Sequence, residues 1–110
     1  MTYKQGDIVF LPFPFTDLTG TKKRPVVIVS NDISPMGDII VAKVTSSLRN
    51  GRFSFPLSDT DVTVPPPFKS EIQCDELFTV HESLIDRKLS SLHWQTLKKV
   101  CLLIQQNFVV

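Results

Sequence analysis

The sequence predicts a mainly β protein that ends in one helix, with a small, strongly bent sheet or barrel carrying the helix. Two observations favour this class. Short segments rich in β-branched and aromatic residues, separated by turn residues, fill the first two thirds of the chain. Over the last part, the apolar residues recur every three or four positions instead of every two, which is typical of an amphipathic helix. A length of 110 residues suits a single domain, 1–110.

The first three strands are expected at 7–11, 25–30 and 38–46. The segment 7–11 is short and apolar, and it lies between Gly6 and Pro12. The segment 25–30 is apolar on both faces and β-branched at four positions, as a buried central strand should be. The segment 38–46 combines Ile, Val and Thr residues. These segments therefore form the predicted centre of the sheet.

The later elements follow from turn chemistry and periodicity. Asn50-Gly51 is a strong hairpin signal, because both residues tolerate a positive φ. After it, Phe53 and Phe55 alternate with polar residues and predict a fourth strand. Two more short strands are expected at 70–74 and 78–81. A helix of about 16–18 residues is expected from Ser91 onward, with Ser90 or Ser91 as its N-cap.

Composition limits the class of protein. Hydrophobic residues make up 42% of the chain, which is too apolar for a disordered protein. No apolar run is long enough to span a membrane, and the N-terminus lacks the apolar core of a signal peptide. Two cysteines are too few for a disulfide scaffold. We therefore expect a cytoplasmic protein with free thiols.

The charge is distributed unevenly although the net charge is only +1. Residues 22–52 are mostly basic in their charged positions, and residues 55–86 are mostly acidic. A dipolar surface with a basic groove would explain this pattern, and so would ordinary solvated faces. Composition alone thus permits nucleic-acid binding without requiring it.

The stretch 12–23 is long for a connection between two strands. It carries Phe13 and Phe15, each directly after a proline, and leads into Lys22, Lys23 and Arg24. Aromatic rings close to basic residues are suited to stacking on unpaired bases while the basic residues bind the phosphate backbone. The alternative is that both rings fold back and pack on the barrel.

Three segments, in order along the chain, together resemble one known family. Residues 6–30, GDIVFLPFPFTDLTGTKKRPVVIVS, resemble the N-terminal motif of the MazF/PemK toxins of toxin–antitoxin modules. VTSS at 44–47 and SEIQCDEL at 70–77 are similar to the later motifs of that family. The resemblance implies an SH3-like barrel of the MazF/CcdB type and a homodimer. It also implies metal-free, sequence-specific cleavage of single-stranded RNA that stops translation and growth until a cognate antitoxin protein blocks the site.

The resemblance also implies the site residues. It makes Arg24 and Thr45 catalytic, and the arginine suits that role because its guanidinium holds phosphate through two donors and never loses its charge. Both are assigned to positioning and to stabilising the transition state, with the proton carriers left open. Asp75 is the third candidate, as a base, as a holder of an arginine, or as a cap of a turn. The expected substrate-binding residues are Phe13, Phe15, Lys22, Lys23, Ser46, Ser47, Ser70 and Gln73.

The expected chemistry needs no cofactor. No cluster of carboxylates or histidines has the spacing of metal ligands, so the 2′-hydroxyl of the RNA is the expected nucleophile. The products would then carry a 2′,3′-cyclic phosphate and a 5′-hydroxyl. Gln73 and Phe78 stand where several relatives carry basic residues, which leaves the rate and the site preference open. Two alternatives follow: an SH3-like module that binds RNA without cutting it, and a toxin of the same fold that poisons a protein such as a topoisomerase.

Overall fold

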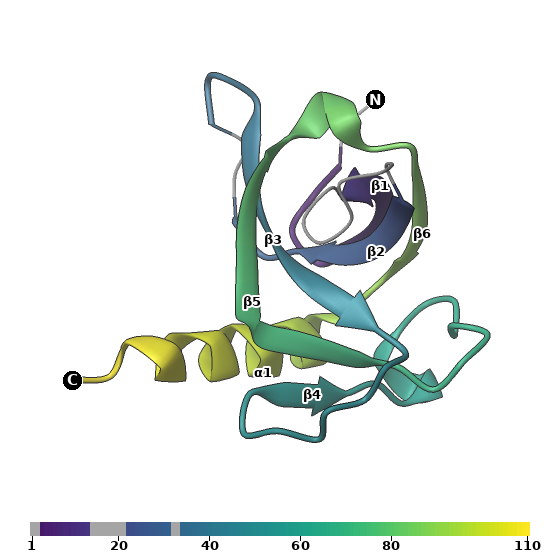
Figure 1. Cartoon of the computed structure of the whole chain (residues 1–110), viewed down its shortest axis with the longest axis vertical. Coiled ribbons are helices and arrows are strands. Elements are labelled where there is room, and N and C mark those ends of the chain that lie inside the picture. Colours follow the sequence, from purple (N-terminus) through teal and green to yellow (C-terminus); the bar gives the residue numbers. More distant parts are fainter. Residues whose placement is uncertain (1–2, 14–21, 32–33) are drawn as a thin grey trace.

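The computed structural model describes residues 3–13, 22–31 and 34–110, and its six strands form one antiparallel sheet in the order β4-β5-β3-β2-β1-β6 (Figure 1). The strands are β1 (Asp7–Phe13), β2 (Lys22–Ile28), β3 (Asp38–Thr45), β4 (Ser54–Pro56), β5 (Glu71–His81) and β6 (Arg87–Ser91). The helix α1 (Trp94–Gln105) follows, and 3-10 turns occupy Asp59–Asp61, Glu82–Leu84 and Gln106–Phe108. The sheet curls into a partly closed barrel, and α1 crosses β5 near one end (Figure 1). The predicted fold class, mainly β with a C-terminal helix, is confirmed.

Apolar side chains cover both faces of the curled sheet, because successive residues of a strand point to opposite sides. One cluster packs under α1, where Val100 of the helix joins Val27, Ile72 and Cys74 of the sheet. The second cluster fills the other face and consists of Val9, Leu11, Val26, Ile28, Ile39 and Val41. The central strand β2 therefore contributes to two cores, as its apolar sequence predicts.

The strand β5 differs from the prediction of two short strands. It runs without a break from Glu71 to His81 and contains a bulge. Ala42 of β3 pairs with Leu77, but the next residue, Lys43, pairs with Gln73. The three residues between these partners are unpaired with β3, which lets the strand bend sharply (Figure 1). The spacing of apolar residues along the sequence does not reveal a bulge. The segments on either side of it were therefore predicted as two separate strands.

The hairpin predicted at Asn50-Gly51 is also corrected. Asn50 does adopt the expected positive φ, 51°. The strand β4 that follows pairs with β5, through Ser54 and Gln73 for example, and does not pair with β3. The Asn-Gly turn therefore shapes a loop between two strands that are not neighbours.

The helix begins three residues later than predicted, and neither predicted serine caps it. Ser90 and Ser91 belong to β6, a polar edge strand that the sequence analysis missed. His93 is the N-cap residue, but its side chain makes no capping hydrogen bond. Asp61 anchors the start of the helix in another way: its carbonyl accepts the His93 N–H at 2.9 Å, and its carboxylate accepts the Thr96 hydroxyl at 2.9 Å. Among the described residues, no helix has the length and apolar character needed to cross a membrane.

Candidate active site

A pocket of about 450 Å³ opens where β2 begins and β3 ends. Val26 pairs with Lys43 in the antiparallel β2–β3 ladder. Arg24 lies two residues before Val26, and Thr45 lies two residues after Lys43. These two residues therefore lie at the same level on neighbouring strands, and both line the pocket. Fold and register thus bring together the two residues that the sequence predicts to be catalytic.

The pocket combines apolar walls with cationic and hydroxyl side chains. Arg24 and Lys43 supply cationic side chains. Hydroxyl groups come from Thr45, Ser46, Ser47, Ser70 and Ser90. None of the described residues that line the pocket is acidic.

Arg24 keeps its charge available. Within the described residues, the ion pairs use other basic side chains, and no carboxylate lies within ion-pair distance of the Arg24 guanidinium. Arg24 lies directly before Pro25 and pairs with Leu11 of β1, which fixes its backbone in the sheet. A half-buried arginine without a counter-ion is suited to bind an anionic ligand.

Thr45 is oriented by a local hydrogen bond. Its Oγ1 accepts the main-chain N–H of Ser47 at 3.0 Å, which closes a short turn at the end of β3. Because the oxygen already accepts, the hydroxyl hydrogen remains able to donate to a ligand oxygen. This turn also brings Ser46 and Ser47 to the rim of the pocket.

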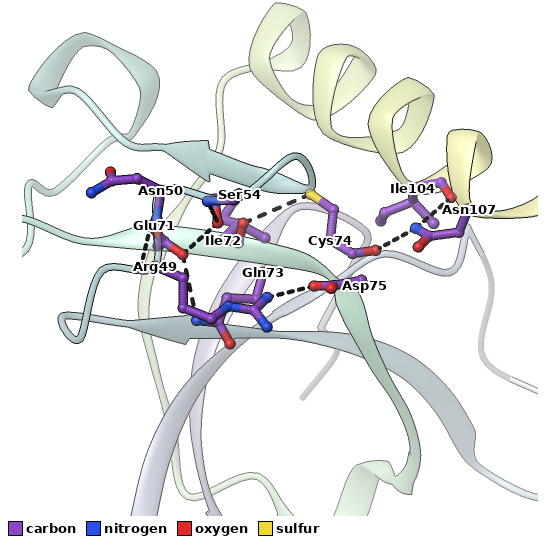
Figure 2. A network of polar contacts seen from close by, with 11 residues as sticks. Arg49, Asn50, Ser54, Glu71, Ile72, Gln73, Cys74, Asp75, Ile104 and Asn107 are labelled. Atoms are coloured by element: carbon purple, nitrogen blue, oxygen red, sulfur yellow. Dashed lines mark hydrogen bonds and ion pairs between the residues drawn. The ribbon is translucent and has the colours of Figure 1, made fainter.

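A buried carboxylate lies across the strand pair from Thr45. Glu71, the pairing partner of Thr45 on β5, is only 1% exposed. Its Oε1 accepts the N–H groups of Arg49 and Asn50, each at 3.2 Å, and its Oε2 accepts the Ser54 hydroxyl at 2.7 Å (Figure 2). Burial alone would raise the pKa of Glu71, but these hydrogen bonds outweigh it and hold the pKa below its usual value. Glu71 therefore fixes the β3–β4 loop as an anion.

Asp75 lies in the β5 bulge and contacts an arginine. Its Oδ1 accepts from Nη2 of Arg49 at 2.6 Å, in an exposed ion pair (Figure 2). Asp75 is not among the residues that line the pocket. Of the roles considered for this residue, holding an arginine is the one that matches its contact.

The other predicted site residues are placed in three different ways. Gln73 is 3% exposed and donates weakly to Glu71 at 3.4 Å. Lys22 is exposed, and Lys23 forms an ion pair with Asp86 at 3.0 Å; neither lines the pocket. The side chain of Phe13, and Phe15 entirely, lie outside the described part of the chain.

Three residues near the site were missed by the sequence analysis. Lys43 was detectable, because it lies two positions before Thr45 in a strand and so shares its face. Phe68, which follows three consecutive prolines, Pro65–Pro67, also lines the pocket, and no motif pointed to it. Glu71 carried no signal, because its role depends on the pairing of distant strands.

Neither Cys74 nor His81 is among the described residues that line the pocket. Burial raises the pKa of Cys74 to about 12, and the nearby Asp75 and Cys101 add to this, so Cys74 stays a neutral thiol. His81 bonds to Ser83 and to the Met36 carbonyl, 2.9 Å from its Nε2. In the described ranges, no three His, Cys, Asp or Glu side chains gather as a metal-binding group.

A curled antiparallel sheet with a C-terminal helix, and a pocket that contains cationic and hydroxyl side chains, define a small barrel protein. The model of the PemK-like, MazF-like toxins of type II toxin–antitoxin systems matches residues 4–108. The chain therefore belongs to this toxin family. Among curated proteins, none matches the sequence significantly.

Solved structures share the fold at low sequence identity. MazF in a MazE–MazF crystal structure from Deinococcus radiodurans superposes with a TM-score of 0.78 at 18% identity, over 98% of this chain and 97% of that chain. An endoribonuclease in complex with its cognate antitoxin, from a mycobacterial species, gives 0.76 at 16% identity, over 97% and 95%. The Mycobacterium tuberculosis toxin MazF-mt6 gives 0.73 at 18% identity, over 93% and 95%. These similarities support the same barrel and helix arrangement.

Proposed function

We propose that this toxin is a sequence-specific endoribonuclease that cleaves single-stranded RNA and thereby inhibits translation and growth. The observation that carries the proposal is the placement of Arg24 and Thr45 at one level of β2 and β3, facing one pocket. Structural relatives described as endoribonucleases share the fold that places these strands side by side.

The chemistry follows from the groups in the pocket. The 2′-oxygen of the RNA attacks the adjacent phosphorus, the bond from phosphorus to the 5′-oxygen breaks, and a 2′,3′-cyclic phosphate and a 5′-hydroxyl result. The 2′-hydroxyl gives up one proton, and the leaving 5′-oxygen gains one. Negative charge grows on the non-bridging oxygens during attack, and the guanidinium of Arg24 stabilises it with the Thr45 hydroxyl as a second donor.

The proposed reaction needs no metal ion. The pocket binds phosphate directly through cations and hydroxyls, and the described lining offers no carboxylate that would favour a bridging cation. The nucleophile belongs to the substrate, so no metal-bound hydroxide is required to generate it.

The proposed partners are an antitoxin protein and a second copy of the chain. Relatives from Deinococcus radiodurans and from a mycobacterial species have been solved with MazE or with a cognate antitoxin. An acidic, partly disordered antitoxin segment would suit a cationic pocket, because it can fold into the site in place of RNA. We expect a homodimer in which basic loops of both copies line one groove.

Incubation with a long unstructured transcript tests the proposal and separates it from its alternatives. Cleavage at defined positions by the wild type, and its loss in Arg24→Ala, are the expected results. Binding without cleavage would indicate a non-catalytic RNA-binding module. Indifference to RNA would contradict the proposal and favour a toxin that acts on a protein target.

A further inference from the structure

We propose that Phe68 is a base-stacking residue, and that the segment 64–68 holds one unpaired base of the RNA beside the phosphate at Arg24. This inference rests on the proposed function. Val64 to Phe68 form one wall of the pocket that Arg24, Lys43 and Thr45 also line. The segment belongs to neither the sheet nor the helix, so its shape comes from its own residues and anchors.

The wall is stiff because its backbone has little freedom. Each of Pro65, Pro66 and Pro67 has a φ fixed by its ring, and none can donate a main-chain hydrogen bond. At one end, the Val64 N–H donates to the Ser90 hydroxyl at 2.9 Å. At the other end, the Ser70 hydroxyl donates to the Phe68 carbonyl at 2.9 Å. The segment 64–68 is therefore held by hydrogen bonds at both ends of its rigid proline centre.

The ring of Phe68 is presented to solvent by this stiff arm. Phe68 is 71% exposed, although a phenylalanine gains free energy by burial. One exposed apolar residue is ordinary on a protein surface. Phe68 differs from such a residue, because its ring is held by a rigid segment at a pocket that also contains Arg24 and Lys43. This combination points to a ligand that has both a ring and a negative charge.

Charge complementarity identifies the occupant. A ligand that places a phosphate at Arg24 and Lys43 and a flat ring at Phe68 is a nucleotide unit of a single strand. Stacking on an aromatic ring contributes about 1–3 kcal/mol per base and tolerates any base. Because the arm is already ordered, little conformational entropy is lost when the base binds. Phe68 would therefore contribute mainly to affinity and to the choice of cleavage register.

The test compares Phe68→Ala with Phe108→Ala. Phe108 is a matched control, since it is 69% exposed and lines a different groove, beside Cys101 and Ile104. The probe is a 2′-O-methyl RNA oligonucleotide spanning a site that the wild type cleaves, so binding is measured without cleavage. We expect Phe68→Ala to weaken binding by on the order of 10-fold, and Phe108→Ala to leave it within about twofold. Both variants should unfold at the wild-type temperature, because the two rings are exposed.

A second measurement identifies the stacked base. Oligonucleotides that lack one base at a time should show one position whose loss weakens binding to the wild type but not to Phe68→Ala. In a Trp94→Phe background, which removes the single tryptophan of the chain, Phe68→Trp should retain binding and lose fluorescence when RNA stacks on the indole.

Three results would overturn the inference while leaving the proposed function intact. They are equal RNA binding by Phe68→Ala and Phe108→Ala, an effect of Phe68→Ala on antitoxin binding alone, and dissociation of a dimer by Phe68→Ala in light scattering. If the wild type neither binds nor cleaves RNA, the proposed function fails as well.

Discussion

Arg24 is the one arginine of the described residues whose guanidinium has neither a carboxylate nor an aromatic ring as its partner. Arg49 is paired with Asp75, while Arg52 and Arg87 lie over aromatic rings, at 5.1 Å from the Phe53 centroid and 5.4 Å from the Phe10 centroid. In the described structure, only Arg24 among the four lines the pocket. An exposed ion pair contributes little to stability, but an unpaired arginine in a pocket costs desolvation that a bound phosphate would repay.

Replacing Arg24 by alanine should therefore remove activity and leave the fold intact. We expect the cleavage rate to fall by on the order of 10²-fold or more, the effect of removing one donor to a developing oxyanion. Thr45→Ala should reduce the rate by less, because its hydroxyl is a neutral donor. Single-turnover rates on one RNA substrate measure both effects. Arg87→Ala, an exposed arginine outside the pocket, is the control; an equal loss there would contradict the assignment.

Glu71 should contribute to stability through the loop that it holds. Glu71→Ala leaves the N–H groups of Arg49 and Asn50 without their acceptor and opens a cavity, so we expect a loss of about 2 kcal/mol or more. Glu71→Gln keeps the shape and one oxygen, and should cost less. Urea unfolding of the two variants measures the difference. Equal stability of Glu71→Ala and wild type would show that the loop does not depend on this carboxylate.

At the scale of elements, the sequence predicted strands that are apolar and missed structure defined by pairing. β1, β2 and β3 were found because each contains a run of apolar residues that includes β-branched Ile or Val. β6 was missed because four of its five residues, RKLSS, are polar, as suits an edge strand with one neighbour. The start of α1 was placed too early because the hydrogen bonds that anchor it come from Asp61, more than thirty residues away in sequence. No local pattern contains that information.

Contacts between residues distant in sequence also limited how much of the site could be predicted. Arg24 and Thr45 followed from two contiguous sequence motifs, 6–30 and 44–47, and the register of β2 and β3 brings them together. Asp75 was recognised as a candidate, but the bulge that separates it from the pocket was not visible. The burial of Gln73 depends on β4 pairing with β5, which replaced the expected hairpin.

The start of α1 provides a test at this scale. Thr96→Val removes the hydroxyl that donates to the Asp61 carboxylate at 2.9 Å while keeping the side-chain volume. We expect a loss of about 1.5 kcal/mol or more, because Thr96 is buried and the acceptor is charged. Thr60→Val, an exposed threonine next to Asp61, is the control. The prediction is contradicted if both variants unfold at the same urea concentration.

At the scale of the whole molecule, the ionised carboxylates of Glu71 and Asp61 connect segments that are distant in sequence. Glu71 joins β5 to the β3–β4 loop, and Asp61 joins the segment before β5 to the start of α1. Burial would raise the pKa of Asp61, but hydrogen bonds from Ser58 and Thr96 and the charge of Lys99 lower it overall. Both folded-state pKa values therefore lie below the unfolded values of about 4.

This sign predicts loss of stability in acid. A group with a lowered folded-state pKa stabilises the protein fully above its unfolded pKa, and this contribution disappears as the pH falls through the folded pKa. The melting temperature should thus be nearly constant from pH 7 to about pH 5 and fall below about pH 4. Glu71→Gln should show a smaller fall over the same range. A wild-type melting temperature that rises on acidification would contradict the ionised state of these groups.

The identity of the nucleophile tests the central claim most directly. An RNA oligonucleotide containing a single 2′-deoxy nucleotide immediately upstream of the cleavage site lacks only the attacking hydroxyl. In excess chelator, the protein should cleave the all-ribose strand to a 2′,3′-cyclic phosphate and a 5′-hydroxyl, and should bind the deoxy-substituted strand without cutting it. Cleavage of the deoxy-substituted strand, or activity that disappears with chelator and returns with magnesium, would contradict the proposed metal-free reaction at Arg24 and Thr45.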